Sequence, residues 1–127
     1  MRYRYKIAFA MLAGIGVGAA ATQALRAQSK APTYVVIAIQ KITDAEAYKP
    51  LPEKGRAAAE AADGRYLIST GNIARLDGNP PERLAVIEFE SVEKAKAWYN
   101  SRAQKKADTI RARSTDSVAF IVEGIAR

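Results

Sequence analysis

Five side chains are of the types that a small binding pocket uses: Tyr48, Arg65, Glu88, Trp98 and Tyr99. Aromatic rings offer apolar surface with a polar tip, and a guanidinium fork matches the two oxygens of a carboxylate or phosphate. Glu88 interrupts an otherwise apolar segment, and a carboxylate in such a place is either paired or has the altered acidity that acid–base catalysts exploit. We therefore predict that these five residues bind a ligand, with Glu88 as the candidate catalytic residue.

Each of these residues also has a simpler, structural explanation. A Trp on the apolar side of an amphipathic helix usually belongs to the core, which would account for Trp98. Tyr48 lies just before Pro50 and could hold the chain against the sheet. Arg65 and Glu88 could form an ion pair near the ends of their strands. The residues alone leave both explanations open.

The residue types that the chain lacks narrow its chemistry. The 127 residues include no Cys, which excludes disulfides, thiol nucleophiles and thiolate metal sites. They include no His either, which removes the commonest general base and the commonest metal and haem ligand. Catalysis would have to use carboxylates, Tyr, Lys, Arg or a cofactor, and we expect no metal and no cofactor.

The net charge of +7 by itself would suggest a nucleic-acid-binding protein, but the charge is not evenly distributed along the chain. Four positive charges lie within residues 1–27, where no acidic residue occurs, so the rest of the chain carries +3. That charge is spread without a basic run longer than Lys105-Lys106. A mixed, solvated surface explains this pattern better than a phosphate-binding patch, and we expect no nucleic-acid partner.

Four segments that would position the candidate residues are predicted to be β-strands. Tyr34–Gln40 is β-branched and continuously apolar, which predicts a strand buried on both faces. The other predicted strands are Arg65–Thr70, Arg83–Phe89 and Ser117–Glu123, with a short extension of the pairing at Ile73–Leu76.

Two helical regions separate the strands. In the first, the sequence TDAE at 43–46 matches a capping box, with a side-chain oxygen at the cap and Glu46 three residues later. Pro50 and Pro52 interrupt this helix, which resumes over residues 53–62. Gly64 is placed to end it in the left-handed conformation.

The second helical region follows the strand that contains Glu88. Ser91 caps its first helix, which carries Val92, Ala95 and Tyr99 on one face with Trp98 beside them. A further helical segment covers about residues 103–111.

The order of elements is βαββαβ, which predicts an α+β, ferredoxin-like fold with a four-stranded antiparallel sheet. Two helices cover only one face of such a sheet, so the other face should alternate with polar residues. Here three strands are apolar on both faces, in the sequences YVVIAI, LAVI and VAFIV. With no spare segment to cover the second face, we predict a homodimer with packed sheets, a dimeric α+β barrel.

The N-terminal residues have the plan of a secretory signal peptide. Positive residues at 2, 4 and 6 precede an uncharged segment at 7–25, and small residues crowd its end. We predict cleavage after Ala27, with Ala24 as the alternative site, which leaves a single domain at 28–127 and a periplasmic or secreted protein. The alternative is a membrane anchor formed by residues 7–25, and the membrane is a partner only if this leader is not cleaved.

Several motifs, in order, match a known family. The segments TDAEAY at 43–48, GRYL at 64–67, PERLAVIEF at 81–89, AWYNS at 97–101 and FIVEG at 120–124 resemble the domain of unknown function 1330 family, over about residues 33–124. This resemblance implies a dimeric ferredoxin-like barrel, distantly similar to cofactor-free monooxygenases of antibiotic biosynthesis, and no established activity. The chain departs from the family at Asp63, where members often carry Gly, and at Gln104, where they often carry Tyr.

These patterns leave two hypotheses for function. The first is an exported, non-catalytic homodimer that binds a small, partly apolar molecule, with an anion as one option, in a cleft between sheet and helices. The alternative is a cofactor-free enzyme of the monooxygenase or isomerase kind, in which Glu88 or a Tyr moves protons and Arg65 holds an enolate or carboxylate.

Overall fold

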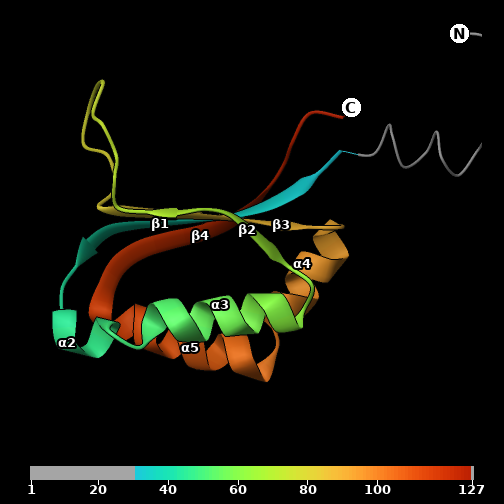
Figure 1. Ribbon diagram of the computed structural model, residues 1–127, viewed down its shortest axis with the longest axis horizontal. Helices are drawn as coiled ribbons and strands as arrows, with labels where there is room; N and C mark the ends of the chain where they lie inside the picture. Colours follow the sequence, from blue (N-terminus) through green and yellow to red (C-terminus); the bar gives the residue numbers. More distant parts are fainter. Residues whose placement is uncertain (1–30, 127) are drawn as a thin grey trace, which may run out of the picture. The chain divides into compact units, whose positions relative to one another are not determined.

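The computed structural model describes residues 31–126 and shows a four-stranded antiparallel sheet with helices on one side (Figure 1). The helical elements are α2 (Ala45–Tyr48), α3 (Leu51–Ala61), α4 (Val92–Tyr99) and α5 (Arg102–Ser114). The strands are β1 (Thr33–Ile42), β2 (Arg65–Thr70), β3 (Arg83–Phe89) and β4 (Thr115–Glu123), in the order β2-β3-β1-β4. The predicted ferredoxin-like βαββαβ arrangement is confirmed, with two helices in each helical position.

The helix-facing side of the sheet forms the core. On the central strand β1, alternate residues point to this side because successive side chains of a strand face opposite ways. Val35 and Ile37 are among the buried residues, and the register places Val35 opposite the buried Ile87 of β3. The helices contribute the small residues Ala59 and Ala95 to the same cluster.

The opposite side of the sheet is apolar and partly exposed. The intervening residues of β1 are only half-buried, so the predicted burial of this strand on both faces is wrong for a single chain. The register brings Val36 of β1 between Val86 of β3 and Phe120 of β4. Phe120 and Val118 are 48% and 57% exposed. We call this side the open face, and no helix within residues 31–126 lies on it (Figure 1).

The first helical region breaks at the prolines, as predicted. Its cap is Asp44 rather than Thr43, because Asp44 is extended and its Oδ1 accepts a hydrogen bond from the Ala47 N–H at 3.1 Å. The chain leaves α2 after Tyr48 and starts α3 at Leu51. Pro52 is tolerated there because the first turn of a helix has no partner for its N–H groups.

The end of α3 differs from the prediction by one residue. Asp63 has the positive φ of 62°, and Gly64 does not have a positive φ. The N–H of Gly64 donates to the Ala59 carbonyl at 2.8 Å, and the N–H of Asp63 donates to the Glu60 carbonyl at 3.1 Å. These two hydrogen bonds form a Schellman motif. Gly64 is needed for space instead, since a Cβ there would lie 2.6 Å from Phe89 Cζ.

The second helical region is two helices joined at Ser101. Ser91 caps α4 as predicted, accepting from the Lys94 N–H at 3.1 Å. Ser101 caps α5 by accepting from the Gln104 N–H at 3.2 Å. The buried residues of α4 are Ala95 and Trp98, while Tyr99, which we grouped with Ala95 on one face, is exposed.

Residues 71–82 form a loop rather than an extension of the sheet. The predicted pairing at Ile73–Leu76 is wrong, because no strand forms there and Leu76 is fully exposed. Gly78 has a φ of 71°, which favours a turn at that point. The loop rises from the sheet on the side opposite the helices (Figure 1).

The N-terminal predictions concern other residues. The signal peptide at 1–27 and the alternative anchor at 7–25 lie outside the described residues. Between residues 31 and 126, none of the helices combines the length and apolarity needed to cross a membrane.

Candidate functional site

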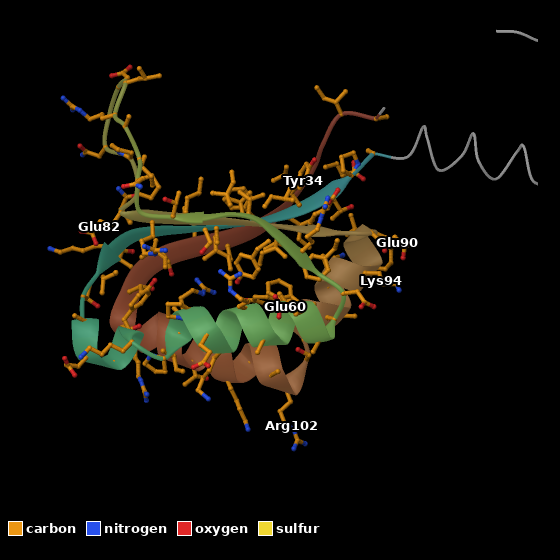
Figure 2. All side chains as sticks on the ribbon, in the orientation of Figure 1. Tyr34, Glu60, Glu82, Glu90, Lys94 and Arg102 are labelled. Atoms are coloured by element: carbon orange, nitrogen blue, oxygen red, sulfur yellow. The ribbon has the colours of Figure 1, made fainter. Side chains whose placement is uncertain are left out.

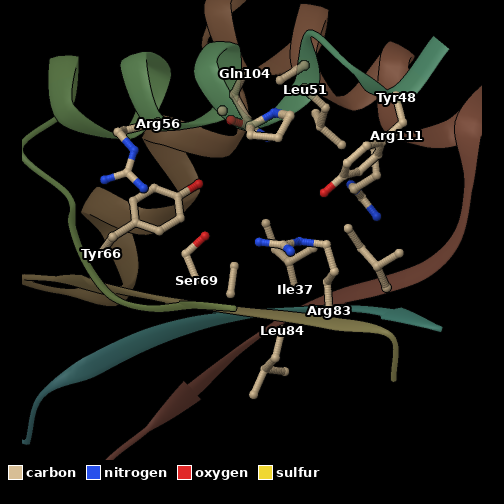
Figure 3. Close-up of a pocket in the computed structure, with 15 residues that line it drawn as sticks. Ile37, Tyr48, Leu51, Arg56, Tyr66, Ser69, Arg83, Leu84, Gln104 and Arg111 are labelled. Carbon is tan, nitrogen blue, oxygen red and sulfur yellow. The ribbon is translucent and has the colours of Figure 1, made fainter. Parts of the chain in front are cut away.

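A cavity of about 70 Å³ lies between the helices and the sheet. Residues of α2, α3 and α5 line one side of it, and residues of β1, β2 and β3 line the other (Figure 3). Part of the lining is aliphatic, including Ile37, Ile39, Leu51 and Ala107. The polar lining side chains are Tyr48, Arg56, Tyr66, Ser69, Arg83, Gln104 and Arg111. We call this the arginine cavity, because three arginines and no carboxylate of the described chain line it.

The three arginines are held differently. The Arg111 guanidinium is largely buried, and it donates to Ser117 Oγ at 2.8 Å and to Asp108 Oδ1 at 3.3 Å. The Arg56 guanidinium lies 5.2 Å from the ring centroid of Tyr66. Arg83 forms no ion pair with any residue that the structure describes. Figure 3 shows its guanidinium extending along the floor of the cavity.

Two tyrosines approach the cavity from opposite sides (Figure 3). Desolvation by burial raises the pKa of Tyr66, and Glu60 and Tyr48 raise it further, while the Arg56 charge lowers it in part. Tyr66 therefore keeps its proton at neutral pH and acts as a hydrogen-bond donor or acceptor rather than as a base. Its hydroxyl lies beside Gly55, where a Cβ would be 3.4 Å from the Tyr66 hydroxyl oxygen, an ordinary van der Waals contact.

Gln104 is the most buried polar side chain of the cavity wall, at 3% exposure. Its Nε2 donates to Asp108 Oδ1 at 3.0 Å, while its buried Oε1 has no hydrogen-bond partner within residues 31–126. Arg111 Nε is likewise buried without a partner among the residues that the structure describes. Buried polar atoms are nearly always hydrogen-bonded, so two unpartnered atoms on residues of one cavity point to a polar occupant.

The structure divides the five predicted residues among three places. Tyr48 lines the arginine cavity and also packs against both hydrophobic clusters, as the structural explanation supposed. Arg65 and Glu88 face each other across β2 and β3 on the open face, where Arg65 Nη2 lies 2.6 Å from Glu88 Oε1. Glu88 thus lies on the other side of the sheet from the arginine cavity.

Trp98 and Tyr99 line a second cavity, of about 290 Å³, beside the edge strand β4. Trp98 belongs to the core and stacks on Phe89 with ring centroids 5.1 Å apart. The Tyr99 ring lies 4.2 Å from Lys105 Nζ. Apart from Lys96 and Asn100, the remaining lining is apolar, so this cavity offers fewer groups for recognition.

Of the polar residues of the arginine cavity, sequence reasoning proposed only Tyr48 as a ligand contact and noted Gln104 only as a departure from the family. A signal existed on α5, where Gln104, Ala107 and Arg111 recur at the spacing of one helix face. On β2 the signal is hidden. A bulge between Tyr66 and Ile68 lets Tyr66 and Ser69 share a face despite their odd spacing.

The described chain offers little for metal binding. Across residues 31–126, no group of three or more Cys, His, Asp or Glu side chains is arranged to hold a metal ion. The chemistry that the arginine cavity can perform on a bound molecule is hydrogen bonding and charge stabilisation by arginines and hydroxyl groups.

Comparison with solved structures shows where this fold occurs. A protein of unknown function from Rhodopseudomonas palustris has 15% identity and a TM-score of 0.60, with 85% of this chain and 94% of that chain covered. SnoaB, a cofactor-independent oxygenase from Streptomyces nogalater, has 8% identity and a TM-score of 0.50, covering 73% and 91%. A dimeric protein of unknown function and ferredoxin-like fold from Bacteroides fragilis has 11% identity and a TM-score of 0.47, covering 73% and 95%.

At these identities the first two likenesses show a shared fold and nothing about activity. The sequence has no significant match among curated proteins. A family model, described as "Domain of unknown function (DUF1330)", matches residues 32–125. The match spans the whole ferredoxin-like domain and agrees with the motifs at 43–48 and 81–89, so this chain belongs to the DUF1330 family.

Proposed function

We propose that this protein binds a small, partly apolar anion in the arginine cavity. The observation that carries the proposal is the Arg83 guanidinium, which faces the cavity without an ion-pair partner among the described residues. Leaving a charge partly buried and unpaired is costly, and an anionic ligand removes that cost. Arg111 adds a second guanidinium whose position is already held by Ser117 and Asp108.

The experiment is a fragment screen by ¹H–¹⁵N NMR with acidic, neutral and basic fragments. Acidic fragments are expected to shift the amides of Ile37, Ala85 and Ala107, which line the cavity. In a Ser69→Leu variant, the larger side chain should weaken these shifts because exposed Ser69 lies on the cavity lining. Asn79→Leu adds the same side chain in the distant loop and is the matched control.

Two outcomes would contradict the proposal. One is that no fragment shifts the cavity amides. The other is that fragments shift only the amides around Tyr99 and Phe120, which would assign binding to the second cavity.

Binding is favoured over the enzymatic alternative by the position of Glu88. A general base must reach the proton that it removes, and Glu88 lies on the open face, paired with Arg65. No carboxylate of the described residues lines the arginine cavity to replace it. A cofactor-free oxygenase or isomerase would have to use a tyrosine of the cavity instead, and Tyr66 keeps its proton at neutral pH.

We also propose that the open face is the interface of a homodimer. Its exposed apolar side chains, among them Ile68, Val118 and Phe120, come from both edge strands of the sheet. An apolar face of this kind marks an interaction surface. Its Arg65–Glu88 pair has no net charge, so two copies of the face do not repel each other through it. Sedimentation at micromolar concentration tests this: a dimer is expected, and a monomer would contradict it.

Export is the third part of the proposal, and it rests on the leader at residues 1–27. The uncharged stretch after the basic residues and the small residues near Ala27 support cleavage. The intact mass of the protein recovered from the periplasm or medium tests it. We expect the mass of a chain that has been cleaved after Ala27. A protein that retains Met1 and is found in the membrane fraction would favour the anchor.

A further inference from the structure

The volume of the arginine cavity limits its ligand. A water molecule requires about 10–15 Å³ of such space. The cavity of about 70 Å³ therefore holds roughly five to seven waters, or a compact molecule with a similar number of non-hydrogen atoms. This size fits the enclosed part of a small ligand, such as an acid of three or four carbon atoms.

The donors of the cavity favour a carboxylate on a carbon body. Arg83 and Arg111 offer planar forks, which match the two oxygens of a carboxylate. Ile37, Leu51 and Ala107 line the same space and would contact the carbon atoms of the ligand. Inorganic phosphate has no apolar part to occupy that side.

The side-chain oxygen Oε1 of Gln104 needs a hydrogen-bond donor, which the ligand could supply. This oxygen is buried and has no partner in the described part of the chain, and the amide nitrogen of the same side chain is already oriented by Asp108. A carboxylate accepts hydrogen bonds and cannot satisfy another acceptor. A hydroxyl group on the ligand satisfies it, and the hydroxyl oxygen remains free to accept from a tyrosine or serine of the wall.

We infer that the ligand is a short hydroxycarboxylate, whose carboxylate is bound by Arg83 and Arg111 and whose hydroxyl donates to Gln104 Oε1. The inference rests on the proposed function, because it names the class of molecule that the arginine cavity takes. It deepens that proposal by requiring three features at once: a single compact carbon body, one negative charge and one hydroxyl donor.

The test is isothermal titration calorimetry of the purified protein with lactate and three related probes. Propionate lacks the hydroxyl, lactamide lacks the charge, and inorganic phosphate lacks the carbon body. Lactate is expected to bind about tenfold or more tightly than each of the others, the difference typical of one hydrogen bond to a buried or charged partner. Equal or tighter binding of any one of the three would overturn the inference.

Substitutions test two of the inferred contacts, that of Arg83 with the carboxylate and that of Gln104 with the hydroxyl. Arg83→Met is expected to weaken lactate binding by about 10- to 100-fold. Arg102→Met removes the same charge from the first turn of α5, where Arg102 points away from the sheet (Figure 2), and should leave binding unchanged. Gln104→Leu should remove the preference for lactate over propionate. If that variant does not fold, the lactate-to-propionate ratio of the unmodified protein decides the point.

Failure of this inference is distinguishable from failure of the proposed function. If other acidic fragments shift the cavity amides while lactate does not bind, the cavity is an anion-binding site and only the inferred ligand class is wrong; if only neutral or basic fragments shift them, the proposed anion binding is wrong too. If no fragment of any class shifts those amides, the proposed function itself is wrong and the inference falls with it.

Discussion

Arg83 and Arg111 line the same cavity, but the fold depends on them to different degrees. Arg111 is tied to Ser117 and to Asp108, whose carboxylate is largely buried. Arg83 has no such partner within residues 31–126 and projects from the start of β3 into the cavity. Arg111 therefore stabilises the protein. Arg83 lowers the stability of the protein unless a ligand binds to it.

This difference predicts opposite effects on stability. Arg111→Met should lower the free energy of unfolding by about 3 kcal/mol, because it leaves Asp108 buried without its charged partner. Arg83→Met should leave that free energy unchanged or raise it by up to about 1 kcal/mol. Urea denaturation of the ligand-free protein measures both. Equal destabilisation by the two substitutions would contradict the assignment of Arg83 as a binding residue.

Two adjacent residues at the end of α3 should respond oppositely to substitution. Asp63 has a φ of 62°, which costs a residue with a side chain roughly 1–2 kcal/mol. Asp63→Gly removes this cost but adds roughly 0.4–1 kcal/mol of unfolded-state entropy, so the net gain should be about 0.5–1 kcal/mol. Gly64→Ala should destabilise by about 1–3 kcal/mol, since its Cβ would overlap Phe89. Thermal unfolding curves of the two variants provide the comparison.

Tyr66 predicts how stability depends on alkaline pH. Burial raises its pKa, so the folded protein keeps the phenol proton at a pH where the unfolded chain, with a Tyr pKa of about 10, has lost it. Its contribution is therefore complete below about pH 10 and is lost as the pH rises through the folded pKa, by at most about 1.4 kcal/mol per pH unit. Tyr66→Phe should flatten the decline between pH 9 and 11 in urea denaturation. If the free energy of unfolding falls with pH equally in Tyr66→Phe and the unmodified protein, Tyr66 does not cause the decline.

At the scale of elements, Ser101 connects α4 to α5 through a single hydroxyl. Its Oγ donates to the Trp98 carbonyl at 2.7 Å and accepts from the Gln104 N–H at 3.2 Å. Ser91 makes only the cap of α4 among the described contacts. Ser101→Ala should cost about 1.5–2 kcal/mol, against about 1 kcal/mol for Ser91→Ala, when unfolding is followed by circular dichroism. A smaller cost for Ser101→Ala would mean that the joint is held by packing alone.

Elements were predicted better than their ends. The apolar runs at Tyr34–Gln40 and Arg83–Phe89 are long enough that only a central strand suits them, and both form. The errors occur where local signals compete. Thr43 and Asp44 are both good caps, and tertiary contact decides: the N–H groups of Thr43 and Asp44 both donate to the Ser114 carbonyl. Ile73 and Leu76 look like strand residues but have no neighbouring strand to pair with in the described chain.

The binding residues were predicted less well, because the positions that meet in space depend on the whole fold. Tyr48, Arg65, Glu88 and Trp98 were chosen by type, and each type is suitable for a pocket. Which of them meet depends on strand register and on the bulge near Leu67, and neither is encoded locally. The register puts Arg65 opposite Glu88 on the open face, and the arginine cavity forms from residues 37 to 111 on the other face. Only the whole fold brings Arg83 and Arg111 to one space.

At the scale of the whole molecule, the open face predicts the oligomeric state. If two copies pack through it, Phe120→Lys places two charges in an apolar interface and should give a folded monomer, because Phe120 is half exposed in the single chain. Ala103→Lys adds the same charge at an exposed position of α5, on the helix side of the sheet, and should remain dimeric. Gel filtration with light scattering distinguishes the two, and circular dichroism checks that Phe120→Lys is folded.

Dimerisation also links stability to concentration. For a protein that unfolds from a dimer to separate chains, a tenfold increase in concentration adds about 1.4 kcal/mol per mole of dimer, so Tm should rise with concentration. The Tm of Phe120→Lys should not change over the same range. If the unmodified protein and Phe120→Lys both show a constant Tm, the open face is not the interface of a dimer. Its exposed Val118 and Phe120 would then need a different partner.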